Sequence, residues 1–78
     1  MIYGKPICVF FDNKCVGVFG RLNDISQKSV ELYGCKLDRA NISAVLTGKR
    51  KHTHGYTFQQ ITKEQYEQYK LQQIIPVY

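Results

Sequence analysis

Basic side chains gather in one part of the sequence. Residues 36–54 contain five Lys and Arg residues and a single acidic residue, Asp38, which gives this stretch a formal charge of +4. The rest of the chain has six basic and five acidic residues and contributes +1. Because a local excess of positive charge attracts polyanions over long distances, the stretch is a candidate nucleic-acid site. The alternative is a charged surface that only keeps the protein soluble.

Three cations stand side by side at Lys49, Arg50 and Lys51, and His52 follows them. A loop of this kind suits contacts with phosphates, which orient a protein on DNA and give a salt-dependent affinity. The hydroxyl of Tyr56 is a further phosphate donor. A solvated loop with no ligand is the alternative interpretation.

An amphipathic segment precedes these cations. Asp38 is a good helix N-cap and Gly48 ends the pattern, so we expect a helix over residues 39–47. The inner side of this helix carries Ile42, Val45 and Leu46. The outer side and its flanks carry small or polar residues: Arg39, Ala40, Asn41, Ser43, Ala44 and Thr47. Small side chains allow close approach to base edges, and Asn and Arg can make bidentate contacts with bases. An ordinary helix surface is the alternative.

Catalytic and metal-binding patterns are missing from the sequence. The six acidic residues are scattered, and neither a Gly-rich phosphate loop nor a nucleophile–base motif is present. His52 and His54 have no Cys or carboxylate nearby to complete a metal site. We therefore expect no enzymatic activity, no metal and no cofactor. Cys8, Cys15 and Cys35 lack CxxC spacing, and Cys8 and Cys15 are predicted to be reduced thiols in the core.

The length of 78 residues predicts a single domain over residues 1–78. The longest apolar run, Ile7 to Phe11, has five residues, whereas a membrane span needs about 20. We expect no membrane association and a cytoplasmic location.

The first elements form a β-hairpin. Residues 6–11 and 15–19 are strand-like, and residues 12–14 have turn chemistry. Pairing Phe11 with Cys15 puts Ile7, Val9, Phe11, Cys15 and Phe19 on one face and Cys8, Phe10, Val16 and Val18 on the other. Both faces are apolar, so each needs a cover.

The remaining elements complete an α+β fold: a β-hairpin plus a third strand, with a helix-turn-helix and a C-terminal helix. A helix over residues 24–33, capped by Asn23 or Asp24 and closed by Gly34, is joined to the helix over residues 39–47 by a short turn. Residues 56–61 alternate as a half-buried strand. Thr62 and Gln65 form a capping box for a helix over residues 63–73, and residues 75–78 read as a short extended tail.

Several motifs occur in a characteristic order. The segment Lys5 to Leu22 is followed by "ISAVL" at 42–46, "GKRK" at 48–51 and "GYTF" at 55–58. Over residues 5–61 the chain resembles the nuclease-associated modular DNA-binding repeat, which is found beside HNH- and GIY-YIG-type homing endonucleases and in phage proteins. The resemblance implies a hairpin followed by a DNA-binding helix-turn-helix. It also implies DNA contacts by Asn41, Ser43, Ala44, Lys49, Arg50 and Lys51.

The chain departs from this family in two ways. It has no nuclease domain, so cleavage is not implied, and Arg21 stands where such repeats often have a Ser that opens the first helix. Residues 62–78 lie outside the resemblance and are a candidate surface for a homodimer or another partner.

Two functions are consistent with the sequence. The first is a non-catalytic module that binds double-stranded DNA as a phage or mobile-element regulator, with the second helix in the major groove and the basic residues on phosphates. The second is a phage-encoded protein-interaction module that binds and inhibits a host protein. For a phage-encoded chain, the compartment is the cytoplasm of the bacterial host cell.

Overall fold

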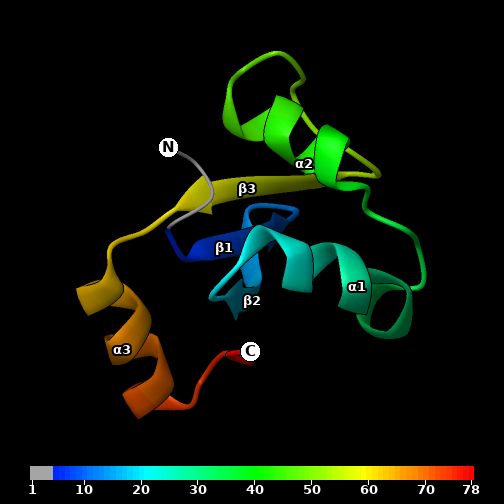
Figure 1. The fold of residues 1–78 in the computed structure, drawn as a ribbon. Helices are drawn as coiled ribbons and strands as arrows, with labels where there is room; N and C mark the ends of the chain where they lie inside the picture. The colour runs from blue at the N-terminus through cyan, green and yellow to red at the C-terminus, as the bar shows by residue number, and fades with distance from the viewer. Residues whose placement is uncertain (1–4) are drawn as a thin grey trace.

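A three-stranded antiparallel sheet forms the centre of the protein. The computed structural model describes residues 5–78. The strands and helices occur in the order β1 (Ile7–Phe11), β2 (Lys14–Phe19), α1 (Leu22–Tyr33), α2 (Arg39–Leu46), β3 (Tyr56–Gln60) and α3 (Lys63–Gln72). The strands lie in the order β2-β1-β3, with both neighbours of β1 antiparallel to it (Figure 1). This arrangement confirms the predicted α+β fold.

The β1–β2 hairpin turns at two residues. Asp12 and Asn13 have φ angles of 53° and 63°, and a two-residue hairpin turn with positive φ at both positions matches the right-handed twist of the strands. The predicted three-residue turn and the pairing of Phe11 with Cys15 are therefore wrong. Phe11 pairs with Lys14, and Phe10 pairs with Cys15.

A bulge then restores the predicted register. Between Val9 and Phe10 the register shifts, and from Val9 back to Ile7 each residue of β1 has its predicted partner: Val9 faces Gly17, Cys8 faces Val18 and Ile7 faces Phe19. Side chains alternate between the two faces of a sheet, so an extra residue in one strand moves the side chains beside it to the opposite face. As a result Val16 packs with the cluster around Ile7, and Cys15 packs with the cluster around Cys8, the reverse of the prediction.

Both apolar faces of the sheet are covered, as predicted. On one face, α1, α2 and the connection between them bury a core against the sheet, which consists of Ile7, Val9, Phe19, Leu22, Ile25, Leu37, Ile42 and Phe58. On the other face, Cys8, Val18 and Ile61 are buried beneath Tyr66 and Tyr69 of α3 and residues of the tail. The helices α2 and α3 therefore lie on opposite faces of the sheet (Figure 1).

The first helix begins earlier than the sequence predicts. It starts at Leu22 after the N-cap Arg21, whose side chain makes no capping hydrogen bond, so neither Asn23 nor Asp24 is the cap. Leu22 is buried, and its burial favours a helical start without a polar cap. The end of α1 is as predicted, since Gly34 closes it with a φ of 72°.

The connection between α1 and α2 is held by a buried serine. The hydroxyl of Ser29 donates to the Ser26 carbonyl at 2.9 Å and accepts from the Leu37 backbone N–H at 2.9 Å. Leu37 is fully buried in the core. Because it lies in the connection, its burial holds the start of α2 near the end of α1. Asp38 is the N-cap of α2 as predicted, although its side chain makes no capping hydrogen bond.

The C-terminal segment packs on the sheet through α3 and a tail. The predicted capping box is confirmed: Thr62 N donates to Gln65 Oε1 at 3.0 Å and Gln65 N donates to Thr62 Oγ1 at 3.1 Å. The predicted extended tail is also confirmed, because Val77 pairs in parallel with Val18 at the outer edge of β2. Tyr66 Oη donates to the Tyr78 carbonyl at 2.8 Å and joins α3 to the tail.

No helix within residues 5–78 combines the length and the apolar character needed to cross a membrane.

Candidate nucleic-acid interface

The end of α2 leads directly into the basic residues. Gly48 has a φ of 84°, its N–H donates to the Val45 carbonyl at 3.2 Å, and the Lys49 N–H donates to the Ala44 carbonyl at 2.8 Å. This pair of bonds is the Schellman arrangement, which satisfies the last carbonyls of a helix. Because the C-terminal end of a helix carries partial negative charge, it is a favourable place for the cations that follow.

The chain is fixed again after the basic residues. Thr53 is 1% exposed, and it exchanges two backbone hydrogen bonds with Tyr56, at 3.0 and 2.8 Å. His54 and Gly55 form the turn between them with positive φ angles. The residues between the two fixed points, 49–52, are all exposed. We refer to residues 49–52 as the basic loop.

Arg50 joins the basic loop to α2. Its backbone N–H donates to the Ala44 carbonyl at 3.1 Å, and its Nε donates to the His52 carbonyl at 3.3 Å. Its Nη1 donates to Asn41 Oδ1 at 3.1 Å. The side chain of Arg50 therefore reaches back to a residue nine positions earlier, and the loop and the helix share one surface.

The predicted orientation of α2 is confirmed on its inner side. Ile42 is fully buried, and Val45 and Leu46 pack against the core. The outer face of α2, defined by the six small or polar residues predicted from the sequence, remains accessible to different degrees. Three of these residues are exposed, namely Arg39, Ala40 and Thr47. The other three are half-buried, namely Asn41, Ser43 and Ala44.

Besides Asn41, two polar side chains of this face are already engaged within the protein. Arg39 Nη1 donates to Asn23 Oδ1 of α1 at 3.0 Å. The hydroxyl of Thr47 donates to the Ser43 carbonyl at 3.0 Å and approaches the Ala44 carbonyl at 3.3 Å, so it points back along its own helix. Sequence spacing does not reveal the contact between Arg39 and Asn23, since it joins two different helices.

Tyr56 lies at the margin of this surface. Its ring centroid is 4.8 Å from that of Phe11 and 4.9 Å from that of Tyr33, and its ring packs against the core. Burial, followed by the nearby Cys35, raises the pKa of the Tyr56 hydroxyl, so this hydroxyl stays protonated and able to donate at neutral pH. A contact between Tyr56 and phosphate stays a prediction.

Cys8 is a poor nucleophile, and the described cysteines are not part of a metal centre. Cys8, Cys15 and Cys35 are free thiols. Burial and, to a smaller extent, the neighbouring Cys15 raise the pKa of Cys8 to about 11, which disfavours the reactive thiolate. Within residues 5–78, no three side chains of His, Cys, Asp or Glu are grouped in a way that could hold a metal ion.

The matched family is one of DNA-binding modules. Residues 27–59 match the family model described as DNA endonuclease I-HmuI-like, NUMOD-like domain, a module associated with homing endonucleases. The match runs from within α1 to β3, so it contains α2 and the basic loop. It confirms the resemblance over these residues, whereas the longer extent of 5–61 stays a prediction. We found no significant match to the chain among curated proteins or among solved structures.

Proposed function

We propose that this chain, with its NUMOD-like segment at residues 27–59, is a non-catalytic module that binds double-stranded DNA. In this proposal the outer face of α2 lies in the major groove and the basic loop lies on the flanking phosphates. The module acts as a regulator in a phage or mobile element, in the cytoplasm of the bacterial host.

The observation that carries this proposal is that α2 and the basic loop form one continuous surface. The Schellman bonds at Gly48 and the hydrogen bond from Arg50 to Asn41 hold them together. Lys49, Arg50 and Lys51 are exposed on this surface. The helix α3 packs on the opposite face of the sheet and leaves the surface uncovered (Figure 1).

Salt dependence provides the test. Counterion release makes the logarithm of the affinity fall with the logarithm of the salt concentration, with a slope of about −0.9 for each phosphate neutralised. The affinity for a random duplex is measured by fluorescence anisotropy at several salt concentrations. Replacing Lys49, Arg50 and Lys51 together by Ala should reduce the slope by about two to three.

A matched variant controls for total charge. Lys5, Lys63 and Lys70 are exposed, and the last two belong to α3. Their replacement by Ala removes the same formal charge and should leave most of the slope in place. Equal slopes for the two triple variants would show that the basic loop does not contact phosphates.

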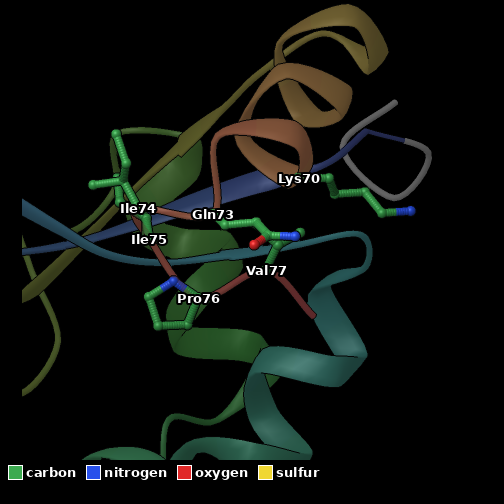
Figure 2. Close-up of a pocket in the computed structure, with 6 residues that line it drawn as sticks. All are labelled: Lys70, Gln73, Ile74, Ile75, Pro76 and Val77. Carbon is green, nitrogen blue, oxygen red and sulfur yellow. The ribbon is translucent and has the colours of Figure 1, made fainter.

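A protein-interaction module is the second candidate function. Leu71 and Ile74 are 82% and 79% exposed, and Ile74 borders a hollow of about 450 Å³ that is lined by Lys70 and residues 73–77 (Figure 2). By contrast, Tyr66 and Tyr69 pack on the sheet. An interface through residues 62–78, with a host protein or a second copy, would therefore use Leu71 and Ile74.

Light scattering coupled to gel filtration tests the homodimer directly. If the wild type is dimeric, Leu71→Ser combined with Ile74→Ser should yield a monomer, because the exposed apolar contact is lost. A monomeric wild type excludes the homodimer. If this variant no longer inhibits the host protein but keeps its affinity for DNA, the host-protein function is favoured over DNA binding.

A further inference from the structure

Three residues form a row across one end of the sheet. Phe11, the last residue of β1, pairs with Lys14 of β2 on one side and with Tyr56 of β3 on the other. Residues that lie directly opposite each other in antiparallel strands point to the same face of a sheet. Tyr56 packs against the core that α1 and α2 cover, so the three side chains belong to the face that carries α2. We refer to Lys14, Phe11 and Tyr56 as the hairpin row.

The hairpin row lies beside the end of the basic loop. The basic loop ends at His52, and the next residue, Thr53, exchanges two backbone hydrogen bonds with Tyr56. The ring of Phe11 rests against the turn between them, because a Cβ placed on Gly55 would be 3.2 Å from Phe11 Cε1. The ring centroids of Phe11 and Tyr56 are 4.8 Å apart. The position of Phe11 relative to the basic loop is therefore fixed by packing.

The hairpin row presents an apolar ring and a cation to solvent. Ile7 and Val9, on the same strand and the same face as Phe11, are fully buried, whereas Phe11 is 45% exposed. Lys14 is exposed as well. The surface of DNA combines the same two features, since phosphates alternate with apolar groups such as deoxyribose carbons and the 5-methyl group of thymine. A Phe side chain is suited to contact such a methyl group.

We infer that the hairpin row is a second contact of this protein with double-stranded DNA, with Lys14 on a phosphate and the Phe11 ring on an apolar group of the duplex. The apolar group is either the thymine 5-methyl group or a deoxyribose. This inference deepens the proposed function and depends on it, because α2 must face DNA for the hairpin row to reach the duplex. It extends the interface from α2 and the basic loop to the turn of the β1–β2 hairpin.

Salt dependence tests the contact of Lys14. The affinity for a random duplex is measured by fluorescence anisotropy at several salt concentrations for the wild type, Lys14→Ala and Lys63→Ala. Lys14→Ala should reduce the slope of log affinity against log salt by about one. Lys63→Ala removes the same charge from α3, on the other face of the sheet, and should leave the slope almost unchanged.

A variant with improved binding provides an independent test. Asp12 places a negative charge in the turn of the hairpin, with a φ of 53°. Asp12→Asn removes this charge and keeps a residue type that tolerates a positive φ. If the turn faces phosphates, the affinity should rise about two- to fivefold, because a repulsive charge is lost. A gain of affinity cannot result from a loss of folding.

Phe11→Ala tests the apolar contact. It should weaken binding about three- to tenfold at every salt concentration and leave the salt slope unchanged, because an apolar contact releases no counterions. Phe11→Leu keeps an apolar side chain and should lose less. Val30→Ala is the control, since Val30 is a 55% exposed apolar residue of α1, and it should bind like the wild type. Thermal unfolding followed by circular dichroism establishes that each variant is folded.

Duplexes that contain deoxyuridine in place of thymidine identify the apolar group, because uracil lacks the 5-methyl group. If Phe11 contacts this methyl group, the wild type should bind the thymine duplex about threefold more tightly than the uracil duplex. Phe11→Ala should then have a weaker preference. If Phe11 contacts deoxyribose, the wild type and Phe11→Ala should distinguish the two duplexes to the same extent.

Three results would overturn the inference. One is a salt slope in Lys14→Ala that equals the wild-type slope. Another is wild-type affinity in Phe11→Ala. The third is an Asp12→Asn variant that binds no more tightly than the wild type. Each of these leaves DNA binding through α2 and the basic loop intact, whereas a wild-type chain that binds no duplex overturns the proposed function and this inference together.

Discussion

The hydroxyl of Tyr33 lies where a side chain at position 17 would begin. A Cβ placed on Gly17 would be 2.7 Å from Tyr33 Oη, which is shorter than a van der Waals contact between carbon and oxygen. Gly17 is buried in the middle of β2 and faces Val9. The ring of Tyr33, the last residue of α1, can therefore rest on the sheet only because β2 has no side chain at this position.

Replacing Gly17 by Ala should destabilise the protein. Overpacking of a close contact typically costs about 1–3 kcal/mol, and the free energy of unfolding in urea measures it. The cost should fall when Tyr33→Phe is added, since the closest clashing atom is then gone, and the remainder reflects the Phe19 ring, which would lie 3.3 Å from the added Cβ. A Gly17→Ala penalty of the same size in both backgrounds would contradict this contact.

Tyr33→Phe alone should stabilise the protein. Within residues 5–78, Tyr33 Oη is buried and has no hydrogen-bond partner, and such an unsatisfied hydroxyl costs about 1–3 kcal/mol. Removing it should raise the free energy of unfolding by about 1 kcal/mol. Tyr66→Phe is the opposing control, because Tyr66 Oη donates to the Tyr78 carbonyl and its loss should destabilise.

Alkaline pH should weaken the fold through Cys8. Burial raises the pKa of this thiol from 9.0 to about 11, so the folded state holds the proton more tightly than the unfolded state. The resulting stabilisation is complete below pH 9 and is lost as the pH rises from 9 to 11, on the order of 2 kcal/mol. Burial also raises the pKa of Tyr33, which extends the loss to higher pH.

Urea unfolding under reducing conditions at pH 8, 9, 10 and 11 measures this dependence. Cys8→Ala should lower stability at pH 8 and flatten the decline above pH 9, because the titrating thiol is absent. Val9→Ala, which also truncates a buried side chain of β1, should lower stability and keep the wild-type decline. Identical pH profiles for wild type and Cys8→Ala would show that another group causes the decline.

The capping box should control how well α3 covers the sheet. Thr62→Ala removes the acceptor of the Gln65 N–H bond and should cost about 1 kcal/mol, whereas Thr62→Ser keeps a hydroxyl and should cost less. Because Tyr66 and Tyr69 of α3 pack over Cys8, local opening of α3 should speed the reaction of Cys8 with an aromatic disulfide reagent. DNA affinity should not change, since α2 lies on the other face. An unchanged thiol reaction rate in Thr62→Ala would argue against α3 as the cover.

Local signals in the sequence predicted much of this fold. The capping box at Thr62, the closing residue Gly34 and the alternation of residues 56–60 each depend on neighbours within a few positions, and each was confirmed. The bulge in β2 could not be predicted, because a two-residue and a three-residue turn are both compatible with the same Asp-Asn-Lys segment. The early start of α1 was also missed, since burial of Leu22 replaces a polar cap.

The candidate site was predictable as a set of residues and not as a set of contacts. From charge and helical spacing, the sequence predicted that the basic loop follows a helix whose outer face carries small or polar residues. The bonds from Arg50 to Asn41 and from Arg39 to Asn23 join residues 9 and 16 positions apart. Such contacts depend on how the helix ends and on how two helices pack, so no spacing rule identifies them. Their consequence, a basic loop joined to α2 and an α2 joined to α1, is visible only in the folded chain.

Gly48 should be needed for DNA binding beyond its contribution to stability. It has a φ of 84°, and a Cβ at this position would have no neighbouring atom within 4 Å, so Gly48→Ala introduces backbone strain of about 1–2 kcal/mol and no clash. Relief of that strain would shift Lys49 and Arg50, which are held by the Ala44 carbonyl. We expect a several-fold loss of affinity for duplex DNA in an anisotropy titration.

Gly34→Ala is the matched control for this prediction. Gly34 has a φ of 72°, also has open space around it, and closes α1 away from the basic loop. Its replacement should cost a similar amount of stability, because the strain has the same origin. Its effect on DNA affinity should be smaller, since Leu37, fixed by its bond to Ser29, lies between Gly34 and α2. Equal affinity losses in the two variants would mean that general destabilisation, and not the position of the basic loop, weakens DNA binding.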